Sequence, residues 1–358
     1  MKHGGDIYRN HIEYDFSVNL NPMGCPPEVT RSVQEGMQNL SEYPDLEQEA
    51  VRRALAGFGG VAPECVLGGN GASELICAVT ASINPKRALM VSPGFTGYEH
   101  ALAAGTDADA HITIDRYFLS DKNGFRIDED ILEYIGEDTD IIYLCNPHNP
   151  TGLNIPGDLL TRICGRSRDT GSALVVDESF LYMSEHPYTL AGRIDEYQNL
   201  YVIGSFTKLF AIPGLRVGYL FTCRDNAGRV MARLPEWNMS VPAQYAATAC
   251  AGLIGDTSFM RDTMDVIRRE RTYIADGIRA ISDSVLAQDK KISVYDSDSS
   301  YMLISSDTDL YHALLGEGIL IRDLSDAGFA DRRFFRIAVR DHDSNCRLME
   351  TLEKVVNE

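Results

Sequence analysis

The sequence predicts an α/β fold with a mostly parallel sheet, followed by a smaller α+β domain. Between about residues 70 and 205, apolar runs typical of buried strands alternate with helical stretches. Strands that read as continuous apolar runs are typical of a parallel sheet covered by helices on both faces. After about residue 242, a long charged helix is followed by short strands lying close together, which indicates a second domain of α+β type.

In chain order, a loop-rich beginning leads to two amphipathic helices expected at 27–40 and 46–58. In the first domain we expect strands at 88–92, 141–145, 173–177 and 200–204, with helices such as 72–83 and 156–168 between them. In the second we expect helices at 243–254 and 258–281 and strands at 292–295, 301–304, 319–322 and 334–339. The predicted division is an N-terminal segment 1–40 that packs with the small domain, a large domain 41–242 and a small domain 243–358.

Composition limits the classes of partner. The chain has 33 Lys and Arg against 52 Asp and Glu, a net charge of −19. That balance argues against a nucleic-acid or anionic-membrane partner, because either needs a basic surface. Eight cysteines include no C-x-x-C pair, so we expect no zinc site and no disulfide framework. The beginning of the chain lacks a basic-then-apolar signal, and no apolar run approaches ~18 residues, so we expect a cytoplasmic protein.

Three polar side chains stand at or just after the ends of expected strands. Asn149 follows the strand 141–145, Asp177 ends the strand 173–177, and Lys208 follows the strand 200–204. In open α/β sheets ligands bind beyond the carboxyl ends of the strands, so one cofactor would reach all three. An amine for covalent attachment, a carboxylate for a pyridine nitrogen and an amide for a phenolic oxygen are what pyridoxal phosphate requires. The sequence therefore predicts a pyridoxal 5'-phosphate site with Lys208 as its catalytic residue.

Each of these residues also has an ordinary structural interpretation. Asp177 has the type and place of a helix-capping aspartate, and Asn149 is a common turn residue in Asn-Pro-Thr-Gly. Lysines are usually solvated, although Lys208 follows an apolar strand among small hydroxyl residues, which suits a buried amine with a lowered pKa. The occurrence of these groups in one ordered set favours the chemical interpretation.

A second group of residues suits the cofactor's phosphate and ring. Ser205 and Thr207 offer hydroxyls, and Arg216, expected in the helical run after Lys208, offers a cation. Gly71-Ala72-Ser73 opens an expected helix, whose first N–H groups form an anion site at the positive end of the helix dipole. Phe95 is a candidate to stack on the cofactor's ring. The equally weighted alternative is that Phe95 is an ordinary core aromatic.

Two arginines in the second domain are candidates for substrate anions. Arg322 ends one apolar strand and Arg336 interrupts another, at 334–339. Burying an arginine is costly without an anion, which a substrate carboxylate would supply. The alternative is an internal salt bridge with one of the many acidic residues.

Over nearly its whole length the chain resembles fold-type I pyridoxal-phosphate enzymes of the aminotransferase class I/II group. Within that group it is most similar to two branches, histidinol-phosphate aminotransferases and L-threonine-O-3-phosphate decarboxylases of cobalamin biosynthesis. The motifs that resemble the decarboxylase branch are His3-Gly4-Gly5-Asp6 and the segments 15–22, 69–71, 93–95 and 211–216. The resemblance implies a seven-stranded, mostly parallel sheet flanked by helices in the large domain.

Position 180 separates the two branches. The aminotransferase pattern Asp-Glu-Ala-Tyr has a tyrosine that contacts the cofactor's phenolic oxygen, whereas here Phe180 ends Asp177-Glu178-Ser179-Phe180, as in the decarboxylase branch. The resemblance thus implies decarboxylation of L-threonine O-3-phosphate, or a related phosphoamino acid, to (R)-1-amino-2-propanol phosphate. The alternative is a histidinol-phosphate aminotransferase, which uses 2-oxoglutarate. A non-catalytic regulator would need an appended partner domain, for which the sequence offers no sign.

The resemblance also implies how the substrate and a second subunit are held. Substrate contacts are expected from His3, Asn19, Arg322 and Arg336. Arg336 is expected at the carboxylate and Arg322, with His3 and a second subunit's Tyr43, at the substrate phosphate, although the two arginines could be exchanged. The family's cross-subunit contact to the cofactor corresponds to Tyr43, which implies a homodimer with active sites at the interface.

Overall fold

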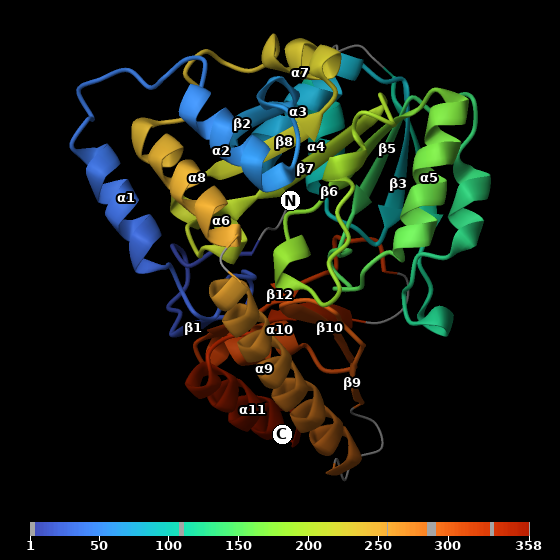
Figure 1. Ribbon diagram of the computed structural model, residues 1–358. Helices are drawn as coiled ribbons and strands as arrows, with labels where there is room; N and C mark the ends of the chain where they lie inside the picture. The colour runs from blue at the N-terminus through green and yellow to red at the C-terminus, as the bar shows by residue number, and fades with distance from the viewer. Residues whose placement is uncertain (1–3, 107–110, 256, 285–290, 330–332, 358) are drawn as a thin grey trace.

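The computed structural model describes residues 4–106, 111–255, 257–284, 291–329 and 333–357. Figure 1 shows a large domain built around a central sheet, with helices on both sides, and a smaller domain below it. Helix α9 (Thr257–Ser284) begins beside the large domain and runs down along the small one. None of the helices in the described ranges combines the length and the apolar character needed to cross a membrane.

The large domain contains a seven-stranded sheet in the order β2-β8-β7-β6-β5-β3-β4. Its strands are β2 (Val66–Asn70), β3 (Arg87–Ser92), β4 (Thr113–Phe118), β5 (Ile141–Cys145), β6 (Ala173–Asp177), β7 (Leu200–Ser205) and β8 (Val217–Thr222). Only β8 runs against its neighbours, pairing antiparallel with both β2 and β7. The mostly parallel sheet predicted from the apolar runs is confirmed, as is the number of strands that the resemblance implied.

Helices cover both faces of this sheet, which is why its central strands are apolar throughout. In β5, Ile142 and Leu144 belong to one buried cluster, whereas Ile141 and Tyr143 belong to another. The first cluster includes side chains of α2 (Glu49–Gly59), α5 (Gly157–Thr170) and α8 (Val241–Ile254). The second includes side chains of α3 (Ala72–Ile83), α4 (Gly97–Gly105) and α7 (Arg224–Met231). Successive strand residues therefore pack on opposite layers of helices.

The small domain contains a four-stranded sheet in the order β12-β13-β10-β9, antiparallel throughout. Its elements after α9 are β9 (Ile292–Val294), β10 (Tyr301–Ser306), α10 (Leu310–Gly316), β12 (Arg322–Asp323), β13 (Arg333–Ala338) and α11 (His342–Asn357). A separate pair joins β1 (Tyr14–Asp15) to β11 (Ile319–Leu320) in parallel. This pairing brings the beginning of the chain against the small domain, where Phe16 is fully buried in the domain's apolar core.

Several expected boundaries were wrong for local reasons. Helix α1 (Pro27–Met37) ends before residue 40, and α2 begins at Glu49 instead of 46. The later start follows from Gln48, whose left-handed backbone, with φ +53°, cannot belong to the helix. Just before it, the carboxylate of Asp45 accepts hydrogen bonds from the backbone N–H groups of Glu47 and Glu49. The expected strand 319–322 is two short strands, because β11 pairs with β1 whereas β12 pairs with β13.

Candidate active site

A cavity of about 220 Å³ lies beyond the carboxyl ends of β5, β6 and β7. It is lined by most of the residues selected from the sequence: Asn19, Ala72, Ser73, Phe95, Asn149, Asp177, Ser205, Thr207, Lys208, Arg216, Arg322 and Arg336. These residues come from both domains and from the segment that precedes α1. The structure therefore gathers groups more than 300 positions apart in the chain around a single hollow.

Lys208 is held on the one-turn helix α6 (Phe206–Leu209), directly after β7. Ser205 caps this turn, since its hydroxyl accepts a hydrogen bond from the N–H of Thr207 at 3.2 Å. Burial, assisted by the positive charges of Arg336 and Arg216, lowers the pKa of Lys208 to about 8, against an ordinary value of 10.5. About a tenth of this amine is therefore uncharged at pH 7, far more than for an ordinary lysine, and the uncharged amine is the form that attacks a carbonyl carbon.

Asp177 ends β6 with its carboxylate buried at the floor of the cavity. Its Oδ2 accepts a hydrogen bond from the Tyr98 hydroxyl at 3.1 Å, and its Oδ1 accepts one from the Ser179 N–H at 3.0 Å. Burial nevertheless raises the pKa of Asp177, because no Lys or Arg of the described residues forms an ion pair with it. A buried carboxylate in this state is stabilised by a cation brought in with a ligand.

At the other end of the cavity, an anion site forms where β2 passes into α3. Gly71 has φ +83° and ψ 165° and precedes α3 without a side-chain cap, so the first N–H groups of that helix are open to a ligand. A Cβ on Gly71 would lie only 2.4 Å from Nη2 of Arg216, which shows how closely this guanidinium approaches the backbone. The expected helical position of Arg216 was wrong: it follows a short 3₁₀ turn, with φ +58°.

The hydroxyls of Ser205 and Thr207 lie 2.7 Å apart on the same side of the cavity. The Ser205 hydroxyl also donates to the carbonyl oxygen of Val217 at 3.1 Å. With Arg216 and the start of α3, this end of the site has two hydroxyls, a cation and backbone N–H groups. Such a set suits a phosphate group.

Arg336 lies in the middle of β13 with its guanidinium buried against the cavity. Its Nη1 donates to Oδ1 of Asn149 at 2.6 Å, and its Nη2 donates to the carbonyl oxygen of Ser17 at 2.8 Å. Its Nε is buried without a hydrogen-bond partner, and burial lowers its pKa to about 10. No carboxylate of the described ranges forms an ion pair with Arg336, so the predicted alternative of an internal salt bridge is wrong for this residue.

Arg322 behaves differently. Its Nη2 donates to the carboxylate of Asp326 at 2.9 Å, which realises the salt-bridge alternative, although its side chain also lines the cavity. Asn19, by contrast, buries both polar atoms of its amide at the cavity without a hydrogen-bond partner. Buried polar groups are usually paired, so the Asn19 amide and the Nε of Arg336 are places where a polar ligand would complete the bonding.

The remaining predicted residues lie at the edge of the site or outside it. Phe95 lines the cavity with its ring edge-on to Tyr98, at a centroid distance of 5.3 Å. Tyr43 does not line the cavity of its own chain: 81% of its surface is exposed, and its ring lies 5.0 Å from that of Trp237. His3 lies outside the described residues.

Sequence reasoning did not select Tyr98, Tyr301 or the backbone of Ser17, although all three contact predicted site residues. Tyr98 and Tyr301 are buried aromatics in a helix and a strand, where such residues normally form the core, so the sequence carried no signal for them. His148 lies beside Asn149 but bonds to Thr151 through Nδ1 at 3.1 Å. Burial lowers the pKa of His148 to about 3, so its imidazole is neutral at physiological pH.

Comparisons with known proteins agree with this geometry. The aminotransferase class I and II family matches residues 12–352. Threonine-phosphate decarboxylase of Salmonella typhimurium is 33% identical over 352 residues, covering 96% of this chain and 91% of that protein. Histidinol-phosphate aminotransferase of Methanosphaera stadtmanae is 26% identical over 347 residues, covering 94% and 89%.

A solved structure extends the similarity to three dimensions. Histidinol-phosphate aminotransferase from Clostridium acetobutylicum superposes with a TM-score of 0.84 at 27% identity, over 96% of this chain and 99% of that one. The match of the family spans more than nine tenths of the sequence, including every strand of the large sheet. The chain therefore belongs to the aminotransferase class I and II family of pyridoxal 5'-phosphate-dependent enzymes.

Proposed function

We propose that this enzyme decarboxylates L-threonine O-3-phosphate, or a closely related phosphoamino acid, to (R)-1-amino-2-propanol phosphate for cobalamin biosynthesis. The observation that carries the proposal is the presence of two guanidinium groups, Arg322 and Arg336, on the cavity that holds Lys208. A substrate with an amine, a carboxylate and a phosphate ester would take the place of Lys208 with its amine and pair one anion with each guanidinium group. Histidinol phosphate has the amine and the phosphate but no carboxylate. The 33% identity to the Salmonella typhimurium decarboxylase supports the same substrate class.

The cavity fits the cofactor at both ends. Lys208 would hold it covalently, and Asp177, whose pKa is raised by burial, would face the ring nitrogen. Asn149 would donate to the phenolic oxygen, and Phe95 would cover the ring. The phosphate would bind between Arg216 and the start of α3, with Ser205, Thr207, Gly71, Ala72 and Ser73 completing that end.

When bound, pyridoxal 5'-phosphate supplies an electron-poor ring that accepts the electron pair released at the substrate's Cα. The protein decides which bond at Cα breaks, because only a bond held perpendicular to the ring can deliver its electrons. Arg336 would hold the carboxylate so that the bond from Cα to the carboxylate carbon takes that position. Carbon dioxide would then leave, and Lys208, which would be freed when the substrate's amine takes its place and would take up that amine's proton, would give a proton to Cα.

Phe180 supports decarboxylation over transamination. Its ring lines the cavity, is buried, and packs edge-on against Tyr301 at 4.9 Å. A tyrosine here would place a hydroxyl near the phenolic oxygen of the cofactor, as in the aminotransferase pattern, and phenylalanine leaves that hydrogen bond out. The electronics of the ring would change accordingly.

The second candidate function is histidinol-phosphate aminotransfer, favoured by the superposition on the Clostridium acetobutylicum structure. One assay separates the two. The purified holoenzyme is mixed with threonine phosphate or histidinol phosphate, with and without 2-oxoglutarate, while carbon dioxide and the absorbance of the cofactor are followed. We expect carbon dioxide from threonine phosphate without any acceptor. Conversion of histidinol phosphate that needs 2-oxoglutarate, without carbon dioxide from threonine phosphate, would refute the decarboxylase.

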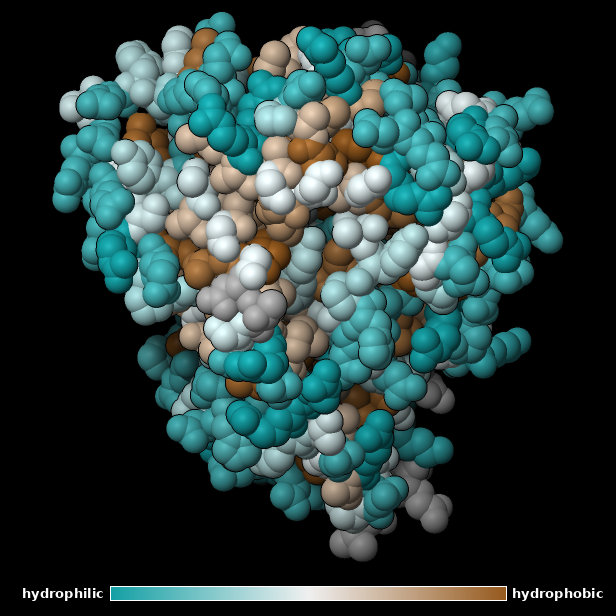
Figure 2. All heavy atoms as spheres, viewed as in Figure 1, coloured by the Kyte–Doolittle hydropathy of each residue, from teal (hydrophilic) through white to brown (hydrophobic). Residues whose placement is uncertain are grey.

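The proposal includes a homodimer in which Tyr43 reaches the partner's active site. Figure 2 shows apolar residues gathered on the upper left of the molecule, where Figure 1 places α1, α2 and α8. The connection from α1 to α2 carries large apolar side chains with exposed fractions from 48% to 81%: Met37, Leu40, Tyr43 and Leu46. A second copy would cover them, and Tyr43, which is too exposed to serve its own cavity, would gain a partner.

A further inference from the structure

We propose that Tyr301 is a positioning residue that fixes the orientation of Arg336 and thereby makes the site selective for substrates that carry a carboxylate. The inference rests on the proposed function, because it assigns the carboxylate to Arg336. It adds a residue that touches neither the substrate nor the cofactor: Tyr301 does not line the cavity and is fully buried behind it.

The ring of Tyr301 forms the support on which Arg336 lies. Strands β10 and β13 are antiparallel with Leu303 opposite Arg336, so Tyr301, two residues earlier, projects from the same face of the sheet as its diagonal neighbour. The guanidinium carbon of Arg336 lies 5.5 Å from the centroid of the Tyr301 ring, within the range of a cation–π contact. The other side of the support is fixed, because the Phe180 ring meets that of Tyr301 edge-on at 4.9 Å.

The hydroxyl of Tyr301 ties the same support to the residue that Arg336 contacts. It donates to the carbonyl oxygen of His148 at 3.1 Å. The next residue, Asn149, accepts a hydrogen bond from Nη1 of Arg336 at 2.6 Å. Tyr301, the His148–Asn149 backbone and Arg336 thus form a closed ring of contacts, in which the guanidinium is held from its face by an aromatic ring and from its edge by an amide. Its Nε is buried without a hydrogen-bond partner.

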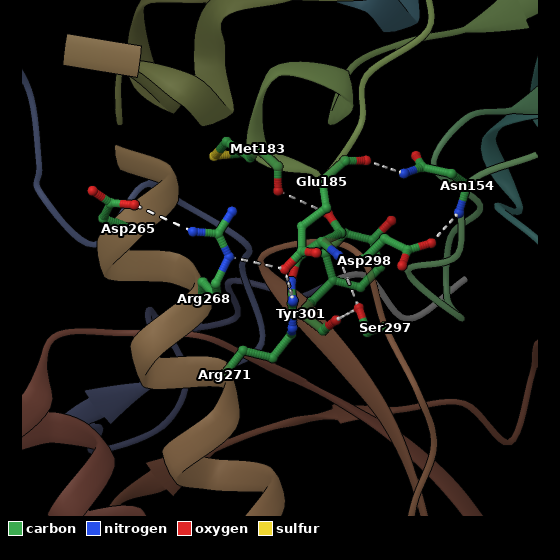
Figure 3. A network of polar contacts seen from close by, with 10 residues as sticks. Asn154, Met183, Glu185, Asp265, Arg268, Arg271, Ser297, Asp298 and Tyr301 are labelled. Atoms are coloured by element: carbon green, nitrogen blue, oxygen red, sulfur yellow. Dashed lines mark hydrogen bonds and ion pairs between the residues drawn. The ribbon is translucent and has the colours of Figure 1, made fainter. Parts of the chain in front are cut away.

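Residues 297–301, which lead into β10, are in turn fastened to the large domain (Figure 3). Ser297 donates from its hydroxyl to the carbonyl oxygen of Tyr301 at 2.6 Å. The N–H of Asp298 donates to Gly152 O at 3.0 Å, and its carboxylate accepts from the N–H of Asn154 at 2.9 Å. The chain after β5, which carries Asn149, is therefore tied to the segment that ends in Tyr301.

The chain after β6, which carries Asp177, is tied to the same segment. The N–H of Glu185 donates to the carbonyl oxygen of Asp298 at 2.8 Å. Figure 3 shows the Glu185 carboxylate reached by both Arg268 and Arg271 of α9, and Arg271 also donates to Ser299 O at 3.2 Å. Residues 297–301 consequently fix the position of Arg336 relative to the carboxyl ends of β5 and β6, which carry Asn149 and Asp177.

This arrangement predicts a selective effect. Without the Tyr301 ring, the guanidinium loses the surface that fixes its plane, while Arg322 and the phosphate end of the site keep their own contacts. Recognition of a carboxylate depends on a fixed, two-pronged donor, so it suffers, whereas recognition of a phosphate elsewhere in the cavity does not. A looser Arg336 also lets the carboxylate turn away from the perpendicular, so the ratio of carbon dioxide released to amino groups transferred falls.

The test compares two unreactive ligands by calorimetry on the holoenzyme. The first is 3-phosphonooxybutanoate, which is threonine phosphate without its amine, and the second is 2-propyl phosphate, which also lacks the carboxylate. We expect Tyr301→Leu to weaken binding of the first ligand about 5- to 30-fold and to leave the second within about twofold. Tyr301→Phe keeps the ring under Arg336 and, because His148 O also accepts from the Gly152 N–H, should stay within about threefold for both ligands.

A matched control exists in Tyr197, a buried tyrosine outside the cavity whose ring carries the guanidinium groups of Arg168 and Arg193 at 5.4 and 5.2 Å. Tyr197→Leu removes the same kind of contact and should lower the unfolding temperature without changing either affinity. Should Tyr301→Leu fail to fold, Ser297→Ala takes its place, because it removes the hydrogen bond to the carbonyl oxygen of Tyr301. We expect the affinity for the carboxylate ligand alone to fall two- to fivefold, about the contribution of one hydrogen bond.

Equal losses for both ligands, a loss confined to 2-propyl phosphate, or no loss in either Tyr301→Leu or its substitute would overturn the positioning role. A wild-type enzyme that binds neither ligand and releases no carbon dioxide from threonine phosphate would instead contradict the proposed function. The two failures are therefore distinguishable.

Discussion

Replacing Gly71 with alanine tests whether Arg216 and the start of α3 bind the cofactor's phosphate. The backbone of Gly71, with φ +83° and ψ 165°, occupies a region open essentially to glycine alone, so alanine costs about 1–3 kcal/mol of stability. Its Cβ would also lie 2.4 Å from Nη2 of Arg216, so the guanidinium must move away. The strain is present with and without ligand, and only the displaced guanidinium changes the affinity. Losing one charged hydrogen bond costs about 1.5–3 kcal/mol, which predicts a dissociation constant for pyridoxal 5'-phosphate raised about 10- to 150-fold.

The assay is a titration of apoenzyme with pyridoxal 5'-phosphate, followed by its absorbance, beside thermal unfolding. Gly171→Ala is the control, because Gly171 also has a positive φ, +77°, yet nothing lies within 4 Å of a Cβ there. We expect that variant to lose stability and keep its cofactor affinity. A folded Gly71→Ala protein that binds pyridoxal 5'-phosphate as tightly as wild type would refute the assignment of Arg216 to the phosphate.

Three further outcomes follow from the buried charges. Attachment of pyridoxal 5'-phosphate to apoenzyme should speed up as pH rises through about 8, because the pKa of Lys208 is lowered to that value and only the uncharged amine reacts. Stopped-flow absorbance measures this rate. Arg336→Met should move the midpoint of the pH profile upward, because it removes a positive charge that lowers the pKa of Lys208. Asp177→Ala should slow turnover about 100-fold, because it removes the carboxylate proposed to pair with the ring nitrogen. Steady-state kinetics measure this, and an unchanged rate would be the contrary result. Burial raises the pKa of Glu178 to about 7, so in the folded protein this carboxyl keeps a proton that the unfolded chain releases above about pH 4.5. The free energy of unfolding therefore falls as pH rises from about 4.5 to about 7. Glu178→Gln should raise the free energy of unfolding by up to about 3 kcal/mol over wild type at pH 8 but by little at pH 4.5, as measured by urea unfolding.

The central strands were predictable because their burial on both faces leaves a plain signature. Strands β5 and β6 have the bounds expected from their apolar runs, and α3 has the bounds expected from its periodicity. Three strands of the large sheet, β2, β4 and β8, were not predicted. The sequence of β2, Val-Leu-Gly-Gly-Asn, contains two glycines and reads as a turn. It forms a strand because β8 offers an antiparallel partner along its whole length, which is a tertiary effect.

The site was predictable where polar residues interrupt or end apolar strands. Lys208, Asp177 and Arg336 all stood out in this way, and the cavity gathers them. The conformation of Arg216 was not predictable, because its φ of +58° lies in the left-handed region, which an arginine rarely adopts. The support beneath Arg336 was equally hidden, since a tyrosine at a strand start is indistinguishable from any other core aromatic until the register of β10 and β13 is known.

The lining of the cavity, which runs from Gly4 to Arg336, has a consequence for biosynthesis. Because β13 leaves the ribosome late, the part of the cavity proposed for the substrate carboxylate is complete only when nearly all of the polypeptide has been made. The residues proposed to hold pyridoxal 5'-phosphate all lie within residues 43–216, and the cofactor would stabilise the folded protein by mass action. A shortage of pyridoxal 5'-phosphate in the cell would thus lower the amount of this protein as well as its catalytic rate.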